Sequence, residues 1–416
     1  MAPRVTIAPP GRREGPRPPR PHGEAARARR TAIVAFAFFL AAAVFLAWQG
    51  IDLASLRRAF PLYALGGFGV LIFGTMRLLI AGMAGREMVG GAASSGFTVG
   101  AAAIGAIGVF ALARFESELA FWPSLLWSAA AISHAVVTVW TMRRPPSRRV
   151  ILDEAAPWAT RAPLDALALG GVVYALISAT LVPASYLGHV RSAAAIHVVL
   201  VGFVIVTIMA VALHILPRFT AVAIPRTATW LLAPPALVGP MWVAMGLDHH
   251  ANWLLTGAWV EGAAFVVFGA TVAWSLVRSR RLRWHHLGYA GAPLAIGIGG
   301  VIALAFVSDG RWAAQLALHG LLNVFGFVGL FVFAASTDLF APALRPGAAP
   351  AKQHARLAAA AALTGLIVAA IGAGRGDASL ARAGMGAYAL AVAWQLAGIV
   401  SAHRRAGRVL TRLRAT

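Results

Sequence analysis

Long apolar stretches separated by short polar segments recur along the whole chain. A helix of about 20 apolar residues crosses the roughly 30 Å hydrocarbon core of a bilayer, and it satisfies its own backbone hydrogen bonds. The pattern therefore predicts an all-α polytopic membrane protein with about twelve transmembrane helices. We place the spans at 31–49, 60–82, 96–113, 119–142, 164–187, 193–216, 228–247, 252–277, 285–307, 312–335, 355–374 and 379–401.

The basic residues fall mainly in the N-terminal tail and in alternate gaps between the spans. Lysine and arginine are enriched in cytoplasmic loops, so this asymmetry predicts that both termini are cytoplasmic. The basic residues behind the net charge of +22 are therefore expected to orient the protein in the membrane and to interact with anionic lipid. No nucleic-acid partner is expected. Arginine supplies every basic residue except Lys352, alongside abundant Ala and Gly. This usage suggests a GC-rich bacterial genome, and hence the bacterial inner membrane.

The composition leaves no room for a separate soluble domain, since 59% of the residues are hydrophobic and 12% charged. We expect a disordered basic cytoplasmic tail at 1–30, a transmembrane helical domain at 31–401 and a basic cytoplasmic tail at 402–416. The polar segments Arg143–Arg161 and Ala341–Gln353 are too short to form a core and are interpreted as linkers. The chain has no cysteine, which excludes disulfides, iron–sulfur clusters, thiolate zinc sites and thioether-attached haem.

Candidate chemistry lies with the ionisable side chains inside the spans, because a charge at membrane depth is costly and is usually retained for function. These residues are Arg77, His134, His197, His214, Glu261 and His319, with His285 and His286 at the start of the ninth span.

Histidine depth divides these candidates into an outer and an inner group. His197 and His214 lie 17 residues apart in the sixth span, about 25 Å along a helix, and cannot share one metal. His319, in the tenth span, has a depth similar to that of His197, so the two predict an outer bis-imidazole site. Gly202 and Gly326, each followed by Phe-Val, would offer a smooth helix face to a flat macrocycle.

A second pair is predicted near the inner surface, where His214 and His134 lie, with His285 and His286 as rival ligands. Alternatively, His214 is an interfacial side chain beside Pro217. Haem suits two histidines better than a bare metal does, because the porphyrin supplies four ligands itself. A catalytic zinc usually takes three protein ligands, and no His-x-x-x-His spacing occurs within a span.

Glu261 lies near the middle of the eighth span, where a carboxylate predicts a proton relay or a substrate contact. Arg77 is its candidate partner, although a long arginine can also reach the interface. An alternative function follows, a proton-coupled secondary transporter of a small solute that uses Glu261 and Arg77. Twelve spans with both termini inside are common among transporters, but no half-to-half repeat is evident.

The motif His197-x4-Gly202-Phe203-x3-Thr207-x6-His214-x2-Pro217-Arg218, with His319-x3-Asn323-x2-Gly326-Phe327, resembles the NnrS-type family. These are twelve-span, haem-containing inner-membrane proteins associated with nitric oxide metabolism. The chain is also distantly similar to haem-copper oxidase subunit I.

The resemblance implies that His197, His214 and His319 are haem or metal ligands, with haem b as the cofactor and copper as an alternative metal. It implies a role in nitric oxide or respiratory-stress metabolism, by gas binding or by electron transfer with a redox partner. His134 has no counterpart in the motif. A binuclear oxidase needs more histidines than the spans contain, so oxygen reduction with proton pumping is not expected.

Overall fold

A computed structural model describes residues 22–75, 91–113, 118–144, 158–249, 251–279, 286–309, 315–340 and 349–415. Over these ranges the chain is helical and has no strand. Among the described residues, twelve helical segments are long and apolar enough to cross a membrane, which confirms the predicted all-α polytopic membrane fold. They are Ala26–Gln49, Leu53–Thr75, Ala93–Leu112, Glu118–Arg143, Ala162–Tyr186, Ser192–Pro217, Arg226–Asp248, Asn252–Arg278, Leu287–Ser308, Leu316–Ser336, Arg356–Arg375 and Ala378–Arg404.

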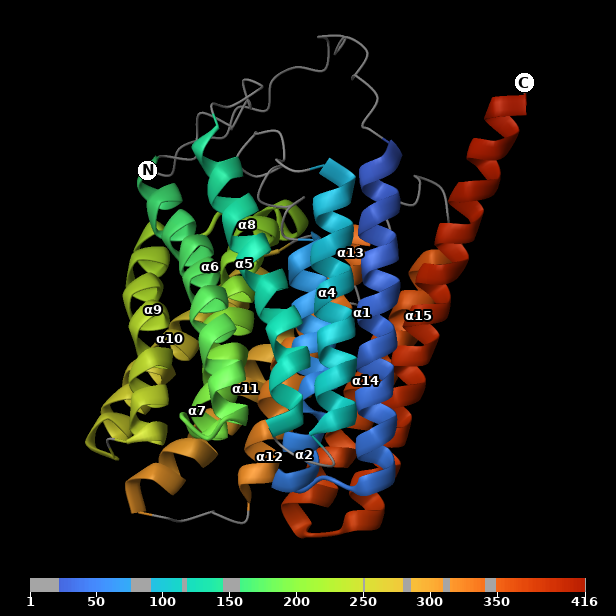
Figure 1. Ribbon diagram of the computed structural model, residues 1–416. Coiled ribbons are helices and arrows are strands. Elements are labelled where there is room, and N and C mark those ends of the chain that lie inside the picture. The colour runs from blue at the N-terminus through green and yellow to red at the C-terminus, as the bar shows by residue number, and fades with distance from the viewer. Residues whose placement is uncertain are drawn as a thin grey trace.

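The spans run roughly parallel to one another (Figure 1), and several consist of more than one helical element. The first five spans are built from α1 (His22–Gln49), α2 (Leu53–Phe60) with η1 (Pro61–Gly69), α4 (Gly91–Leu112), η2 (Glu118–Ala120) with α5 (Phe121–Arg143), and α6 (Trp158–Tyr186). The next four are α7 (Ser192–His197) with η3 (Val198–Ile205) and α8 (Val206–Thr220), then α9 (Arg226–Asp248), α10 (Ala251–Arg278) and α11 (Leu287–Asp309). The last three are α12 (Leu316–Leu321) with η6 (Leu322–Gly329) and α13 (Leu330–Phe340), then α14 (Ala349–Arg375) and α15 (Ala378–Ala415).

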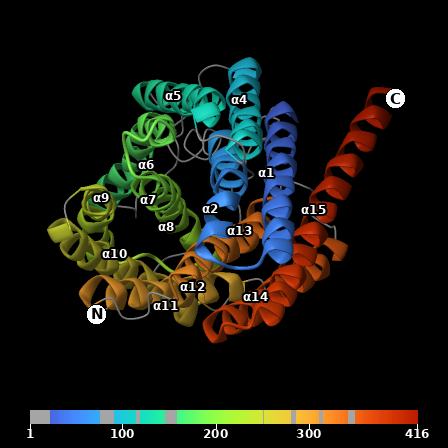
Figure 2. The same ribbon diagram turned by 60° about the horizontal axis from the view of Figure 1, so that its bottom comes forward.

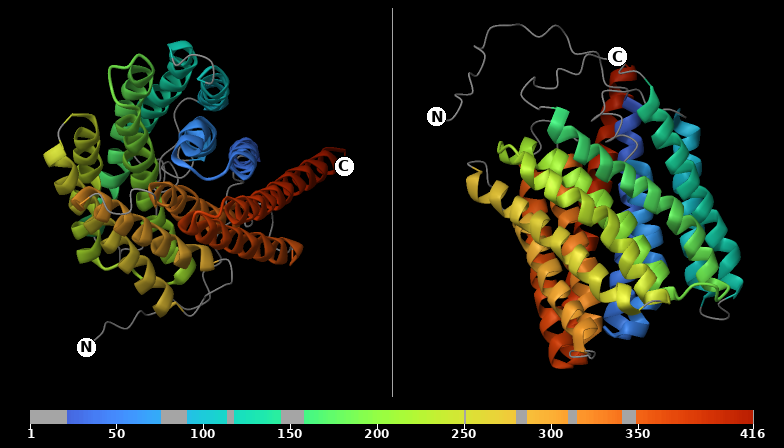
Figure 3. Two further views of the ribbon diagram at one scale, coloured as in Figure 1. Left: turned by 90° about the horizontal axis from the view of Figure 1, so that it is seen from below. Right: turned by 90° about the vertical axis from the view of Figure 1, so that its left-hand side faces the viewer.

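The second, sixth and tenth spans form the interior of the bundle. They are the most buried spans, with 83%, 78% and 67% of their most apolar windows inside the molecule. The other spans pack against one another in chain order, and α15 closes the path by packing on α1. Figure 2 shows α15 beside α1, and the left view of Figure 3 shows the same two helices, red and blue, from below. The histidine-bearing spans six and ten are therefore interior elements.

The same pattern of helix contacts occurs three times along the described residues, once in every four spans. α4 with α5, α9 with α10, and α14 with α15 form helical hairpins, and each hairpin packs onto the next unit through α6, α11 and α1. Each interior span carries a π-helical stretch, η1, η3 or η6, and each stretch contains a Gly-Phe pair. π-Helical turns are rare and are frequent at functional sites. The chain is thus built of three similar four-span units.

Aromatic side chains fill the centre between the second, fourth and sixth spans. Phe73 stacks on Phe203 with ring centroids 5.4 Å apart, and it also contacts Trp127 at 5.7 Å. The indole Nε1 of Trp127 donates a 3.2 Å hydrogen bond to the carbonyl of Leu65. A buried indole N–H that finds a partner is the usual arrangement. These contacts join the first four-span unit to the second.

Several helix boundaries differ from the sequence interpretation. Helices α6 and α14 begin at Trp158 and Ala349, inside the two segments interpreted as linkers. Helix α1 begins at His22, so the last part of the tail expected to be disordered is helical, in keeping with its Ala- and Arg-rich sequence. Helix α15 likewise continues through the basic segment to Ala415. The second span begins at Leu53, where the Oδ1 of Asp52 caps α2 by accepting a 2.7 Å bond from the Ser55 N–H.

Candidate functional site

His197 and Glu261 form a polar pair between the sixth and eighth spans. Nε2 of His197 lies 2.8 Å from Oε2 of Glu261, and the side chains are 16% and 11% exposed. Hydrogen bonds in which one partner is ionised are shorter and stronger than neutral ones. The expected pairing of Glu261 with Arg77 is not tested, because Arg77 lies outside the described residues. The partner that the structure gives Glu261 is His197.

The backbone of Glu261 is fixed by close packing of α10 on α9. A Cβ atom added at Gly239 would lie 2.9 Å from both N and Cα of Glu261, a distance that no side chain tolerates. Small residues let two transmembrane helices approach in this way. Gly239 thus brings α9 against the backbone of Glu261 and fixes the position from which the glutamate side chain extends toward His197.

His319 is held by the ninth span and by its own helix. Its Nδ1 lies 2.8 Å from the carbonyl oxygen of Gly299, and Nδ2 of Asn323 lies 3.1 Å from Nδ1 and 3.2 Å from Nε2. The bond to a carbonyl requires that Nδ1 carries the proton, so Nε2 keeps its lone pair. A Cβ at Gly299 would lie 2.6 Å from Oδ1 of Asn323, so the glycine leaves room for the present position of that side chain.

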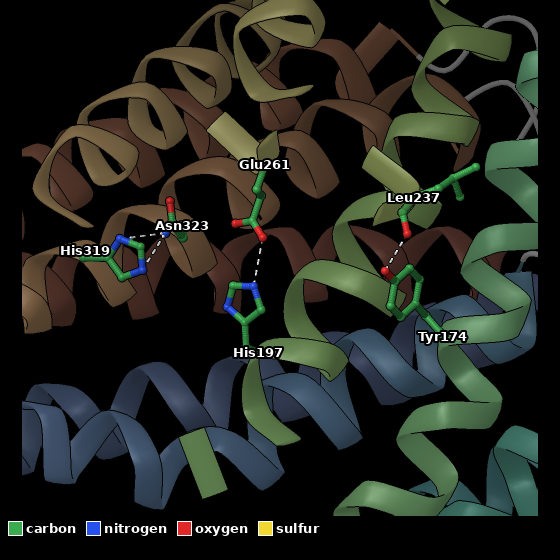
Figure 4. Close-up of polar contacts among 6 residues, drawn as sticks. All are labelled: Tyr174, His197, Leu237, Glu261, His319 and Asn323. Atoms are coloured by element: carbon green, nitrogen blue, oxygen red, sulfur yellow. Dashed lines mark hydrogen bonds and ion pairs between the residues drawn. The ribbon is translucent and has the colours of Figure 1, made fainter. Parts of the chain in front are cut away.

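His197 and His319 lie in one region of the molecule, and their joint role as an outer pair stays a prediction. Figure 4 shows His319 with Asn323, and Glu261 with His197, side by side. Next to them, the hydroxyl of Tyr174 donates a 2.7 Å bond to the carbonyl of Leu237 (Figure 4).

Gly202 and Gly326 do not have the role that the sequence suggested. A Cβ at Gly202 would overlap the ring of Tyr174, and one at Gly326 would lie 2.6 Å from Cβ of Ala295. The faces expected to receive a macrocycle are occupied by neighbouring helices, so that expectation is wrong. Both glycines serve close helix packing in the interior spans.

The two inner histidines come from different helices, α5 and α8. The ring of His134 is 2% exposed and lies 5.1 Å from that of Phe73, which in turn stacks on Phe203. Nδ1 of His214 bonds to the Ala210 carbonyl of its own helix at 2.8 Å. The pairing of His134 with His214 stays a prediction.

Of the two rival inner ligands, the structure describes one. His286 is 3% exposed and packs on Tyr289, with ring centroids 5.7 Å apart. His285 lies outside the described residues. Among the described residues, no three His, Asp or Glu side chains are grouped so as to hold a metal ion. A haem needs only one or two protein ligands, so this finding does not bear on the haem prediction.

Sequence reasoning missed Asn323 as a partner of His319, and it missed Gly299, Gly239 and Tyr174. One signal was present, since Asn323 follows His319 by four residues and side chains at that spacing meet on a helix. The others come from different helices, and no spacing along the chain reveals them.

No protein-family model matches the chain, and no curated protein is significantly similar to it in sequence.

Proposed function

We propose that this chain is an integral membrane haem-binding protein of the bacterial inner membrane, related in type to NnrS and distantly to oxidase subunit I. Its role is in nitric oxide or respiratory-stress metabolism. The observation that carries the proposal is the convergence of His197 and His319, from spans four apart, on one region inside a membrane-spanning bundle. Ionisable groups at that depth are costly, and they are usually retained for a function.

The surroundings of His319 support the assignment of haem. Imidazoles that ligate metals usually donate their second N–H to a carbonyl or a carboxylate, which fixes the tautomer and the ring orientation. Gly299 provides such a carbonyl for Nδ1 of His319. A bound haem would supply an iron centre for one-electron transfer or for binding a diatomic gas.

The experiment is a reduced-minus-oxidised absorption spectrum of the detergent-purified protein, with haem quantified per chain. We expect a b-type spectrum, and we expect His319→Ala to abolish it. His189→Ala is the matched control, because His189 is an exposed histidine in the outer turn after α6. A folded, colourless wild-type protein would refute the proposal.

Proton-coupled transport is the second candidate, and the His197–Glu261 pair favours it. A buried carboxylate hydrogen-bonded to an imidazole is a proton-accepting arrangement of the kind found in membrane proton relays. Loss of pH-gradient-driven solute uptake in Glu261→Gln, in a protein that contains no haem, would establish this function instead.

A further inference from the structure

Arg29 is a buried arginine near the start of the first membrane span, and it is 5% exposed. Helices α1 and α15 pack against each other, and between them Nε of Arg29 donates a 3.4 Å hydrogen bond to Nδ1 of His403. This bond is long, because N–H donors usually lie about 2.9–3.0 Å from their acceptors. Neither residue belongs to the candidate site described above, and the functions proposed for that site do not use them.

No counter-charge accompanies Arg29 in the described part of the chain. Among the described residues no carboxylate forms an ion pair with it, and its one hydrogen bond goes to His403, which is itself a base. Taking a guanidinium out of water is costly unless an opposite charge is paired with it. Arg30 and Arg404, the exposed sequence neighbours of the two residues, add further positive charge. An anion bound here would therefore stabilise the protein.

The donor groups of Arg29 and His403 suit a phosphate. Arg29 uses only its Nε–H within the described chain, so both of its Nη groups can donate to another molecule. Because Nδ1 of His403 accepts the bond from Arg29, the neutral imidazole carries its proton on Nε2, and this N–H is a further donor. The planar fork of a guanidinium binds phosphate oxygens in a bidentate manner.

The depth of these two residues indicates a lipid as the source of the phosphate. Arg29 lies in the first turn of the span Ala26–Gln49, and His403 lies in the last turn of the span Ala378–Arg404. Figure 1 shows the start of α1 and the end of α15 on the same side of the bundle. The ends of membrane spans lie at the level of the lipid headgroups, where basic residues attract anionic lipids. A phospholipid phosphate is thus the anion present at this depth.

We propose that Arg29 and His403 form a binding site for the phosphate of an anionic phospholipid between α1 and α15. The Nη groups of Arg29 and the Nε2–H of His403 donate hydrogen bonds to the phosphate oxygens, and the phosphate is the counter-charge of Arg29. This site is more specific than a general attraction of basic segments to anionic lipid, because it depends on a buried guanidinium. It does not depend on the proposed haem, since neither residue lies in the candidate site.

The test uses the delipidated full-length protein in detergent. Phosphatidylglycerol or phosphatidylcholine is titrated in, and the lipid bound per chain is measured by native mass spectrometry. The wild type is expected to bind phosphatidylglycerol more tightly, and Arg29→Gln should weaken that binding by about tenfold or more through the loss of charge-assisted hydrogen bonds. Arg404→Gln is the matched control, because it removes the same charge from an exposed position next to His403. Its binding should change by about twofold at most.

Three outcomes would overturn the proposal. Equal losses of binding in Arg29→Gln and Arg404→Gln would show only the general attraction between basic residues and anionic lipid. Equal binding of phosphatidylcholine and phosphatidylglycerol by the wild type would show that the site does not select an anionic lipid. If inorganic phosphate alone protected the wild type, but not Arg29→Gln, from thermal unfolding, the ligand would be the free anion.

Two further variants separate binding from folding, which is checked by tryptophan fluorescence. Arg29→Lys keeps the positive charge but loses the planar fork, and His403→Ala removes the Nε2–H donor. Both should fold like the wild type and bind phosphatidylglycerol more weakly. If Arg29→Gln does not fold, these variants decide the question, and unchanged binding in both would refute the site.

Discussion

Replacing Gly202 with alanine tests whether the interior glycines serve helix packing. In the structure a Cβ at this position would overlap Cδ1 of Tyr174 and lie 2.7 Å from its Cγ and Cε1. The ring has little room to move, because Tyr174 is 3% exposed and its hydroxyl is hydrogen-bonded to Leu237. Overpacking of this kind usually costs about 1–3 kcal/mol. We therefore expect Gly202→Ala to lower the free energy of unfolding by about that amount.

The control is Gly100→Ala in α4, where no heavy atom lies within 4 Å of the added Cβ. Alanine is favoured over glycine in a helix by about 0.5–1 kcal/mol, so this variant should be as stable as the wild type or more stable. Unfolding by heat or by dodecyl sulfate, followed through tryptophan fluorescence in mixed micelles, measures both variants.

A double variant isolates the contact itself. Once Tyr174→Ala has removed the ring, adding Gly202→Ala should cause no further loss of stability, because the overlap no longer exists. The packing argument fails if Gly202→Ala is as stable as Gly100→Ala. If the variant folded normally but lost its haem, the glycine face would instead belong to the cofactor.

Three further predictions concern topology and stability. Because the chain has no cysteine, single-cysteine variants Arg144→Cys and His189→Cys report topology directly. An impermeant thiol reagent on whole cells should label only His189→Cys, and labelling of Arg144→Cys alone would invert the predicted orientation. Glu261→Ala should destabilise the protein by about 3 kcal/mol through the unpaired His197, whereas Glu261→Gln should lose less, as measured by thermal unfolding. Trp127→Phe should cost about 1–3 kcal/mol through its lost hydrogen bond and volume, and unchanged unfolding would contradict that.

The number and positions of the spans were predictable from the sequence because each span is a local property. A run of apolar residues spans the bilayer whatever surrounds it, and the span from 96 to 113 was found in this way at Ala93–Leu112. The boundary at Leu53 was not predicted, because Arg57 and Arg58 interrupt the apolar pattern there. The Asp52 cap and the amphipathic α2 explain why the helix nevertheless begins early.

The internal repeat was not predicted from the sequence, for a different reason. A comparison of two six-span halves finds no correspondence, because the repeating unit has four spans. Its visible mark in the sequence is the Gly-Phe pair of the second, sixth and tenth spans, and two residues alone are too common in membrane helices to indicate a repeat. Packing reveals it, because the three interior spans occupy corresponding positions.

The sequence by itself determined the class of the protein, its spans and the short set of residues able to do chemistry in a membrane. Hydropathy acts along the chain, and charged groups at membrane depth are rare enough to stand out. Only the tertiary structure decided that Glu261 pairs with His197, that Gly299 and Asn323 hold His319, and that His134 packs against Phe73. Those contacts join residues on different helices, and their geometry depends on how closely the helices pack, which no single span encodes.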